Sequence, residues 1–195
     1  RNNFNYKVQD IKIFEIRRVY NANSESSLPE ERRHVAGLIM GENAFAYNFR
    51  PRPFDFFDIK GDVEGICELM AVPDVRFMRP DPVPPFLHPG ICAEIRVQDH
   101  VIGLTGKLNP LVADSLKIDE NIYLFELDLE LLNQYVATLQ VIEEISKFPE
   151  ITRDLAVVVD IDRPAGEIIE KIYNFQNKYL KEVKLFDIYE GKEIP

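Results

Sequence analysis

The sequence predicts an α+β fold built on an antiparallel sheet. Segments with the β-branched and aromatic character of strands follow one another along most of the chain, and only a few helical patterns stand between them. A doubly wound parallel sheet would need strands and helices in regular alternation. The chain has 195 residues, 46% of them hydrophobic, which is enough for one large domain or two modest ones.

The first two predicted strands cover residues 11–20 and 32–40. The first strand places apolar residues among charged neighbours, as Ile11, Ile13 and Phe14 show. The second strand becomes apolar towards its end, which indicates that this end is buried.

The clearest helical pattern covers residues 56–70, with Asp55 as the predicted N-cap. Apolar residues recur there at steps of three and four: Phe56, Ile59, Val63, Ile66, Cys67 and Met70. We expect this stripe to face the sheet, with both Ile66 and Cys67 buried.

Two further features lie in and after this helix. Gly61 and Gly65 are four residues apart and share one helix face, where we expect another backbone to approach closely. Six prolines between Pro73 and Pro89 then predict extended, irregular chain.

A hairpin follows, with strands at 91–97 and 101–108 around the compact turn at 98–100. The remaining elements of this first unit alternate between helix and strand. They are a helix that Pro110 opens and that runs through Leu116, a strand at 122–129, and a helix near 131–136.

A second unit is expected to start near residue 147. It contains a predicted strand at 155–160, a helix opened by Asp162 and Pro164, and a strand at 182–189. One β-α-β unit of fewer than 50 residues makes a marginal core. We therefore expect this unit to be half of a domain.

Charge and composition limit the function. The chain carries 23 basic and 33 acidic residues, a net charge of −10, which argues against a non-specific nucleic-acid binder. Cys67 and Cys92 make neither a zinc site nor a disulfide framework, which favours a reducing, cytosolic setting. No apolar run approaches the length of a membrane-spanning helix, so no membrane association is expected.

An acidic cluster is the obvious candidate for metal binding, because hard divalent cations need several converging carboxylates. Its members are Asp55, Asp58, Asp62, Glu64 and Glu68. On a helix these side chains do not all share one face, so a solvated helix surface is the favoured interpretation.

No other catalytic pattern is present. The histidines, His34, His88 and His100, have no metal-ligand spacing. The serines lie in no nucleophile elbow, and the chain has no glycine-rich phosphate loop.

Six long blocks of the chain carry a family resemblance. They are DFFDIKGDVEGICELM (55–70), PFLHPGICAEI (85–95), GLTGKLNPLVADSLKI (103–118), IYLFELDLELL (122–132), SKFPEITRDLAVVVD (146–160) and VKLFDIYEG (183–191). The blocks resemble the β subunit of bacterial phenylalanyl-tRNA synthetase. They come in the family's order and span residues 11–195 almost without a break.

This resemblance implies two domains. Residues 1–146 would form a non-catalytic class II synthetase-like core, an antiparallel sheet with flanking helices whose first strands lie upstream of Arg1. Residues 147–195 would form the first half of a truncated, ferredoxin-like anticodon-binding domain.

The family's catalytic α subunit has the same fold and the pattern F-G-x-G-L-E-R-L, which supplies glycines for close approach and an arginine for ATP phosphate. In the equivalent stretch of this chain, Glu126 and Asp128 replace the glycines and Leu131 replaces the arginine. Two carboxylates without a cation repel a triphosphate. This degenerate motif implies no catalytic or cofactor-binding residue in the segment.

The resemblance therefore implies a structural and tRNA-binding partner of the α subunit in a cytoplasmic, ATP-dependent phenylalanine–tRNA ligase. The expected assembly is an (αβ)₂ heterotetramer that binds phenylalanine tRNA, with contacting residues that the sequence does not identify. The whole enzyme would use ATP and magnesium, and the magnesium-binding carboxylates would lie upstream of Arg1, so no metal is expected in this segment.

Two alternatives stay open. One is a regulatory or partner-binding protein on a degenerate synthetase fold, which has no need of the anticodon-binding block at 146–160. The other is a metal-dependent hydrolase that uses Asp55, Asp58 and Asp62.

Overall fold

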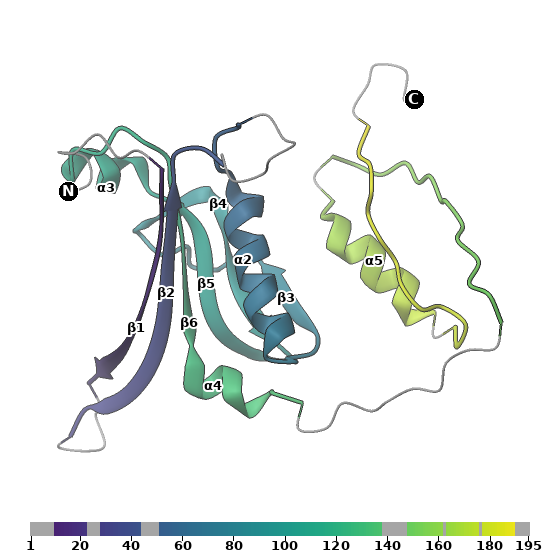
Figure 1. The fold of residues 1–195 in the computed structure, drawn as a ribbon, viewed down its shortest axis with the longest axis horizontal. Helices are drawn as coiled ribbons and strands as arrows, with labels where there is room; N and C mark the ends of the chain where they lie inside the picture. Colours follow the sequence, from purple (N-terminus) through teal and green to yellow (C-terminus); the bar gives the residue numbers. More distant parts are fainter. Residues whose placement is uncertain are drawn as a thin grey trace. The chain divides into compact units, whose positions relative to one another are not determined.

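An antiparallel sheet of six strands, in the order β1-β2-β6-β5-β4-β3, organises the first part of the chain (Figure 1). The computed structural model describes residues 10–22, 28–43, 51–137, 148–161, 163–175 and 177–189. By contact density the chain divides into two units, Arg1–Ile142 and Glu143–Pro195. No helix among the described residues is long and apolar enough to span a membrane.

The strands confirm most of the predicted β-structure. Their bounds are β1 (Ile11–Asn21), β2 (Glu30–Met40), β3 (Val75–Met78), β4 (Leu87–Val97), β5 (His100–Leu108) and β6 (Ile122–Asp128). The proline-rich segment from Pro73 to Pro89 is not irregular throughout, since it contains β3 and the first residues of β4. Pairing within the sheet stabilises both stretches, which the sequence pattern alone does not mark as strands.

The β1–β2 hairpin is the longest uninterrupted ladder, with eleven consecutive residue pairs from Ile11↔Met40 to Asn21↔Glu30. Strand β6 pairs with β2 only from Met40 back to His34. The end of the hairpin beyond this point, residues 18–21 and 30–33, therefore extends past the pairing with β6. We call this part the distal hairpin.

Helix α2 (Phe56–Leu69) covers one face of the sheet (Figure 1). Its predicted N-cap is confirmed: the Asp55 carboxylate accepts hydrogen bonds from the backbone N–H groups of Phe57 (2.8 Å) and Asp58 (3.3 Å). The Asp58 carboxylate in turn accepts one from the Asp55 N–H at 2.8 Å. This capping box satisfies donors that the first helical turn leaves free.

The buried face of α2 consists of Ile59, Val63 and Cys67, which pack into the core of the sheet. Ile66 is only partly buried, so the prediction that it is buried like Cys67 was wrong. A single turn of helix advances the chain by 3.6 residues, which leaves Ile66 at the edge of the stripe rather than at its centre.

The expected close approach at the two glycines of α2 was also wrong. A Cβ atom at Gly61 or Gly65 would have no neighbour within 4 Å among the described residues outside the helix's own backbone. Both glycines lie away from the stripe that packs on the sheet, so no neighbouring element comes near them.

Two short helices flank the last strand. Helix α3 (Pro110–Ser115) begins after Asn109, and α4 (Leu129–Gln134) follows β6 directly with Asp128 as its N-cap. Both were predicted within one or two residues of their observed bounds.

The second unit contains one regular element among its described residues, α5 (Ala165–Asn174). It begins after Pro164, which forms no side-chain cap, and Asp162, also predicted to open it, lies outside the described residues. The predicted helix is confirmed.

The predicted strands at 155–160 and 182–189 do not form β-ladders. In a split β-α-β unit the two strands are not neighbours, so each needs a further strand to satisfy its backbone. The sequence predicts the extended conformation, but only a partner strand makes it a sheet.

Candidate functional site on the open face of the sheet

The three positions that the family resemblance aligns with the ATP-binding motif of the α subunit, Glu126, Asp128 and Leu131, lie in β6 and in α4. Side chains alternate along β6: Phe125 and Leu127 are buried in the core beside α2, whereas Glu126 and Asp128 point to the other face. We call this side, opposite α2, the open face. Leu131 lies in the first turns of α4 and packs against the core.

Asp128 is the buried anion of the open face, with 7% of its surface exposed. Its carboxylate accepts a hydrogen bond from the Leu131 backbone N–H at 2.9 Å, which caps α4. It accepts a second from the Arg32 guanidinium, also at 2.9 Å. Burial by itself raises the pKa of Asp128, but the bonds from Leu131 and Arg32 lower it further than burial raises it, so the pKa lies below its ordinary value.

Glu126 is paired with a histidine of the neighbouring strand. The Nδ1 atom of His34 lies 2.7 Å from a Glu126 carboxylate oxygen, and its Nε2 atom lies 3.8 Å from Asp128. The buried Nε2 atom has no hydrogen-bond partner among the described residues. His34, which has no metal-ligand spacing in the sequence, thus lies between the two carboxylates of the motif.

This cluster of four side chains, Arg32, His34, Glu126 and Asp128, does not fit a nucleotide triphosphate. By the family resemblance, phosphate would approach the backbone closely at the positions of Glu126 and Asp128, where this chain has carboxylates, and the Arg32 guanidinium already pairs with Asp128. Across the described part of the chain, no group of three or more histidine, cysteine or acidic side chains is arranged to hold a metal ion. The contacts within the cluster link β2 to β6, and Asp128 also caps the start of α4.

The distal hairpin carries a second set of charges. Arg18 and Arg33 are paired directly opposite each other in the ladder, and each has its own acidic partner. Arg18 contacts Glu31, and Arg33 lies 3.1 Å from Glu130. Like charges directly across a ladder are unfavourable, so these acidic partners offset the repulsion.

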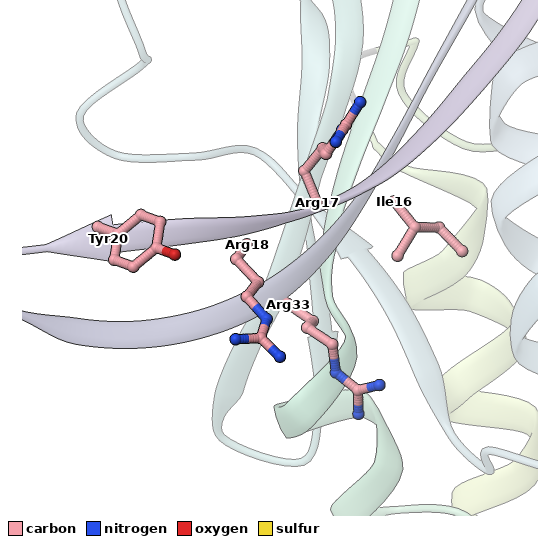
Figure 2. A pocket seen from close by; sticks show the side chains of 5 residues that line it. All are labelled: Ile16, Arg17, Arg18, Tyr20 and Arg33. Atoms are coloured by element: carbon pink, nitrogen blue, oxygen red, sulfur yellow. The ribbon is translucent and has the colours of Figure 1, made fainter.

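A shallow hollow of about 460 Å³ lies on the distal hairpin. Figure 2 shows Arg18 and Arg33 pointing to one side of the ribbon and Arg17 to the other. The lining residues are Ile16, Arg17, Arg18, Tyr20 and Arg33. Since Arg17 also contacts Glu15, all three arginines of the hollow face carboxylates of this chain.

The acidic cluster of α2 does not converge on one point. Asp55 and Asp58 form the capping box, and Arg52 binds Asp58 through two hydrogen bonds of 2.7 and 2.8 Å. Asp62 pairs with Lys12 of β1 at 2.7 Å. Each of these three carboxylates thus already has a partner within the chain, and the assignment of the cluster to a solvated helix surface stays a prediction.

The other histidines and the cysteines lie in separate places. His88 accepts a hydrogen bond from the Gly90 N–H at 3.1 Å, and His100 lies 2.6 Å from the Tyr135 hydroxyl. Cys67 is buried in the core, whereas Cys92 is partly exposed in β4. Burial raises the pKa of both thiols.

Sequence reasoning missed the pairing of Arg32 and His34 with the motif carboxylates. The signal was present as the charged run Arg32-Arg33-His34 at the start of the strand predicted at 32–40. It could not be used, because the partner strand and its register are set by the sheet and not by any local pattern.

Two family models match the chain. The model described as "Phenylalanyl tRNA synthetase beta chain CLM domain" matches residues 1–129. The model described as "Ferredoxin-fold anticodon binding domain" matches residues 146–195. The second match begins one residue before the domain boundary expected from the sequence.

Individual proteins match nearly the whole chain. Proteins named phenylalanine–tRNA ligase beta subunit from Geobacter metallireducens, Lactiplantibacillus plantarum and Symbiobacterium thermophilum are 32%, 35% and 36% identical to it. The alignments cover 99%, 97% and 100% of this chain, but 24%, 24% and 22% of the three relatives. The chain thus spans about a quarter of their length, and it belongs to the family of phenylalanyl-tRNA synthetase beta chains.

Proposed function

We propose that the chain acts within phenylalanine–tRNA ligase as a non-catalytic segment of the β subunit. Residues 1–146 form the synthetase-like core that contacts the α subunit in an (αβ)₂ heterotetramer, and residues 147–195 take part in anticodon recognition. The whole enzyme uses ATP and magnesium in the cytoplasm to charge phenylalanine tRNA, and this segment binds neither. Family membership and the names of the relatives support this proposal.

The cluster on the open face is the observation that carries the non-catalytic assignment. A triphosphate placed over Glu126 and Asp128 would meet two carboxylates, one of them nearly buried. It would also have to compete with Asp128 for the Arg32 guanidinium, the one arginine of the cluster. Since removing the partner of a buried carboxylate is strongly destabilising, the fold opposes that exchange.

The net charge of the second unit limits how it can bind RNA. From Phe148 onward the sequence has seven basic and ten acidic residues, so no positive surplus attracts phosphate. In this proposal, recognition by residues 147–195 rests on specific contacts to bases, and binding of tRNA by the isolated chain is weak.

Phenylalanine-dependent ATP–pyrophosphate exchange tests the non-catalytic assignment. The chain alone should give no exchange above a blank without enzyme, and the α subunit assembled with a full-length β subunit serves as the positive control. Titration calorimetry of the chain with ATP should show no binding. Exchange by the chain alone would contradict the assignment.

Copurification tests the proposed partner. The chain, carrying an affinity tag, should retain the cognate α subunit, whereas an α subunit of an unrelated class II synthetase should not be retained. Equal retention of both, or of neither, would contradict the proposed contact. A matched titration with phenylalanine tRNA and a tRNA of different anticodon should show weak binding with a preference for the first.

A further inference from the structure

The distal hairpin extends beyond the strand that supports the rest of β2. Strand β6 ends at Asp128, opposite His34, so residues 30–33 pair only with β1 among the described residues. Only Val19 and Arg32 are partly buried there, and the other side chains of the distal hairpin are exposed. A two-stranded segment has little stability of its own in water. The faces of the distal hairpin thus add little to the core and are accessible to a ligand.

One face of the hairpin carries two arginines side by side. Arg18 and Arg33 are direct partners in the ladder, and their side chains are 65% and 62% exposed. Figure 2 shows both pointing to the same side of the ribbon. Ile16 and Tyr20 lie two positions before and after Arg18, so they share this face of β1. These four side chains line the shallow hollow described above.

The acidic partners leave part of each guanidinium group unused. Within the described part of the chain, the Arg18 side chain donates only through Nη1, to Glu31, and the Arg33 side chain only through Nε, to Glu130. An arginine side chain carries five N–H donors. Donors therefore remain at Nη2 of Arg18 and at both Nη atoms of Arg33. Because exposed ion pairs contribute little to stability, the carboxylates also oppose a new ligand only weakly.

The chemistry of this face fits a phosphate group of an extended ligand. Planar guanidinium forks with paired free donors match the oxygens of phosphate. A free small molecule is usually enclosed over most of its surface, which a shallow hollow does not provide. An RNA strand presents phosphate to the two arginines and a base to the exposed ring of Tyr20, which is 61% exposed. An acidic peptide would use the arginines but would leave the ring without a stacking partner.

The net charge of −10 does not oppose a contact of this size. Four of the 23 basic residues stand in two adjacent pairs, Arg17-Arg18 and Arg32-Arg33, which the ladder brings together. Arg17 points to the other side of the ribbon in Figure 2, and Arg32 is paired with Asp128. The phosphate contact is therefore assigned to Arg18 and Arg33 alone.

We propose that Arg18 and Arg33 bind the phosphate backbone of an RNA strand and that the ring of Tyr20 stacks on a neighbouring base. The contact uses one face of the hairpin and not its outer edge, so it does not depend on whether another strand pairs with β1. It goes beyond the proposed function, which assigns RNA recognition to residues 147–195, and adds a contact in the first unit that is independent of base sequence.

Titration of the full 195-residue chain with fluorescently labelled phenylalanine tRNA at low ionic strength tests the arginines. Arg18→Gln should raise the dissociation constant about threefold, and Arg18→Gln with Arg33→Gln about tenfold. The double variant should also weaken the salt dependence of binding by about one to two in the log–log slope. Lys12→Gln is the matched control, because it removes an exposed, ion-paired charge from the same face of β1 outside the hollow. Circular dichroism checks that each variant is folded.

Two further variants separate charge from geometry. Arg18→Lys with Arg33→Lys keeps both charges but loses the forks, so its affinity should lie between those of the unmodified chain and the double glutamine variant. Tyr20→Leu keeps an apolar side chain but loses the stacking ring and should raise the dissociation constant severalfold. A loss in Lys12→Gln as large as in Arg18→Gln, an unchanged affinity in the double glutamine variant, or no measurable binding of tRNA at low salt would overturn the proposal.

The choice of ligand distinguishes this contact from anticodon recognition. A tRNA with a different anticodon should lose affinity by the same factor in the double glutamine variant, because the arginines contact phosphate and not bases. A chain that binds both tRNAs equally and loses affinity for both would contradict the anticodon assignment of residues 147–195 and would support the contact at the hairpin. Displacement of tRNA by submillimolar inorganic phosphate, or by a polyglutamate peptide as effectively as by an RNA strand of equal charge, would overturn RNA as the ligand.

Discussion

Helices α2 and α5 resemble each other in sequence pattern but differ in what they bury. Helix α5 separates its apolar and polar faces more sharply than α2 does. Yet α2 buries three side chains against the sheet, whereas none of the residues of α5 is buried. The two segments that flank α5, at 155–160 and 182–189, form no β-ladder, and most of their side chains are exposed.

The difference shows that amphipathicity alone does not make a core. In the first unit, each strand has at least one hydrogen-bonded neighbour, and the resulting surface receives the apolar stripe of α2. In the described part of the second unit no such surface is present. Most of the stability of a short helix comes from packing, so α5 depends on contacts that the extended segments can supply only when they are paired.

A pair of isoleucine substitutions tests this comparison with the largest expected effect. Ile59→Ala removes a side chain that is 0% exposed and should lower the free energy of unfolding by about 2–5 kcal/mol. Ile169→Ala on α5 removes a partly exposed side chain and should cost less than about 1 kcal/mol. Urea unfolding followed by circular dichroism measures both. Similar losses would mean that the second unit has a core of its own.

Amide substitutions of two acidic residues compare the stability that an ion pair contributes in each unit. Asp128→Asn weakens both the cap of α4 and the pair with Arg32, and should cost about 1–3 kcal/mol. Glu150→Gln breaks the exposed pair with Lys181 in the second unit and should leave the unfolding midpoint unchanged. A midpoint shift for Glu150→Gln as large as that for Asp128→Asn would contradict the contrast.

The pH dependence of the unfolding free energy tests whether the ionised carboxylate of Asp128 stabilises the fold. Because its pKa in the folded state lies below the ordinary value of 3.8, the unfolded chain binds the proton first as the pH falls. The stability from the ionised carboxylate is therefore fully present above pH 3.8 and is lost as the pH falls through the folded-state pKa. The difference in unfolding free energy between the unmodified chain and Asp128→Asn should be largest near neutral pH and should shrink below pH 3.8. A difference that stays constant with pH would exclude the carboxylate charge as its source.

Glycine substitutions in the two helices should give the smallest effects. A Cβ at Gly61 of α2 or at Gly166 of α5 meets no atom of the described residues within 4 Å outside the backbone of its own helix. Alanine at Gly61 should therefore stabilise the fold by about 0.5–1 kcal/mol through helix propensity. The same change at Gly166 should raise helix content without moving the unfolding midpoint of the sheet. As a control for steric room, Gly37→Ala should destabilise the chain, because its Cβ would lie 2.3 Å from the ring of Phe125.

The sequence alone was sufficient for the local elements of the first unit. Asp55 predicts where α2 begins because an N-cap bonds to backbone groups only two or three residues further along the chain. The turn at Gln98 and Asp99 predicts the β4–β5 hairpin for the same reason, since its two strands are adjacent in sequence. The family resemblance and the replaced residues at Glu126, Asp128 and Leu131 also came from the sequence.

Only the tertiary structure decided what those residues contact. The register between β2 and β6 brings Arg32 and His34 to Asp128 and Glu126 across more than 90 positions of sequence, and no local pattern encodes that distance. Strand β3 likewise depends on its neighbour in the sheet, β4. Local propensities favour the conformation of a segment. A backbone hydrogen bond between strands or a buried ion pair also needs a partner residue, and the fold determines which residue that is.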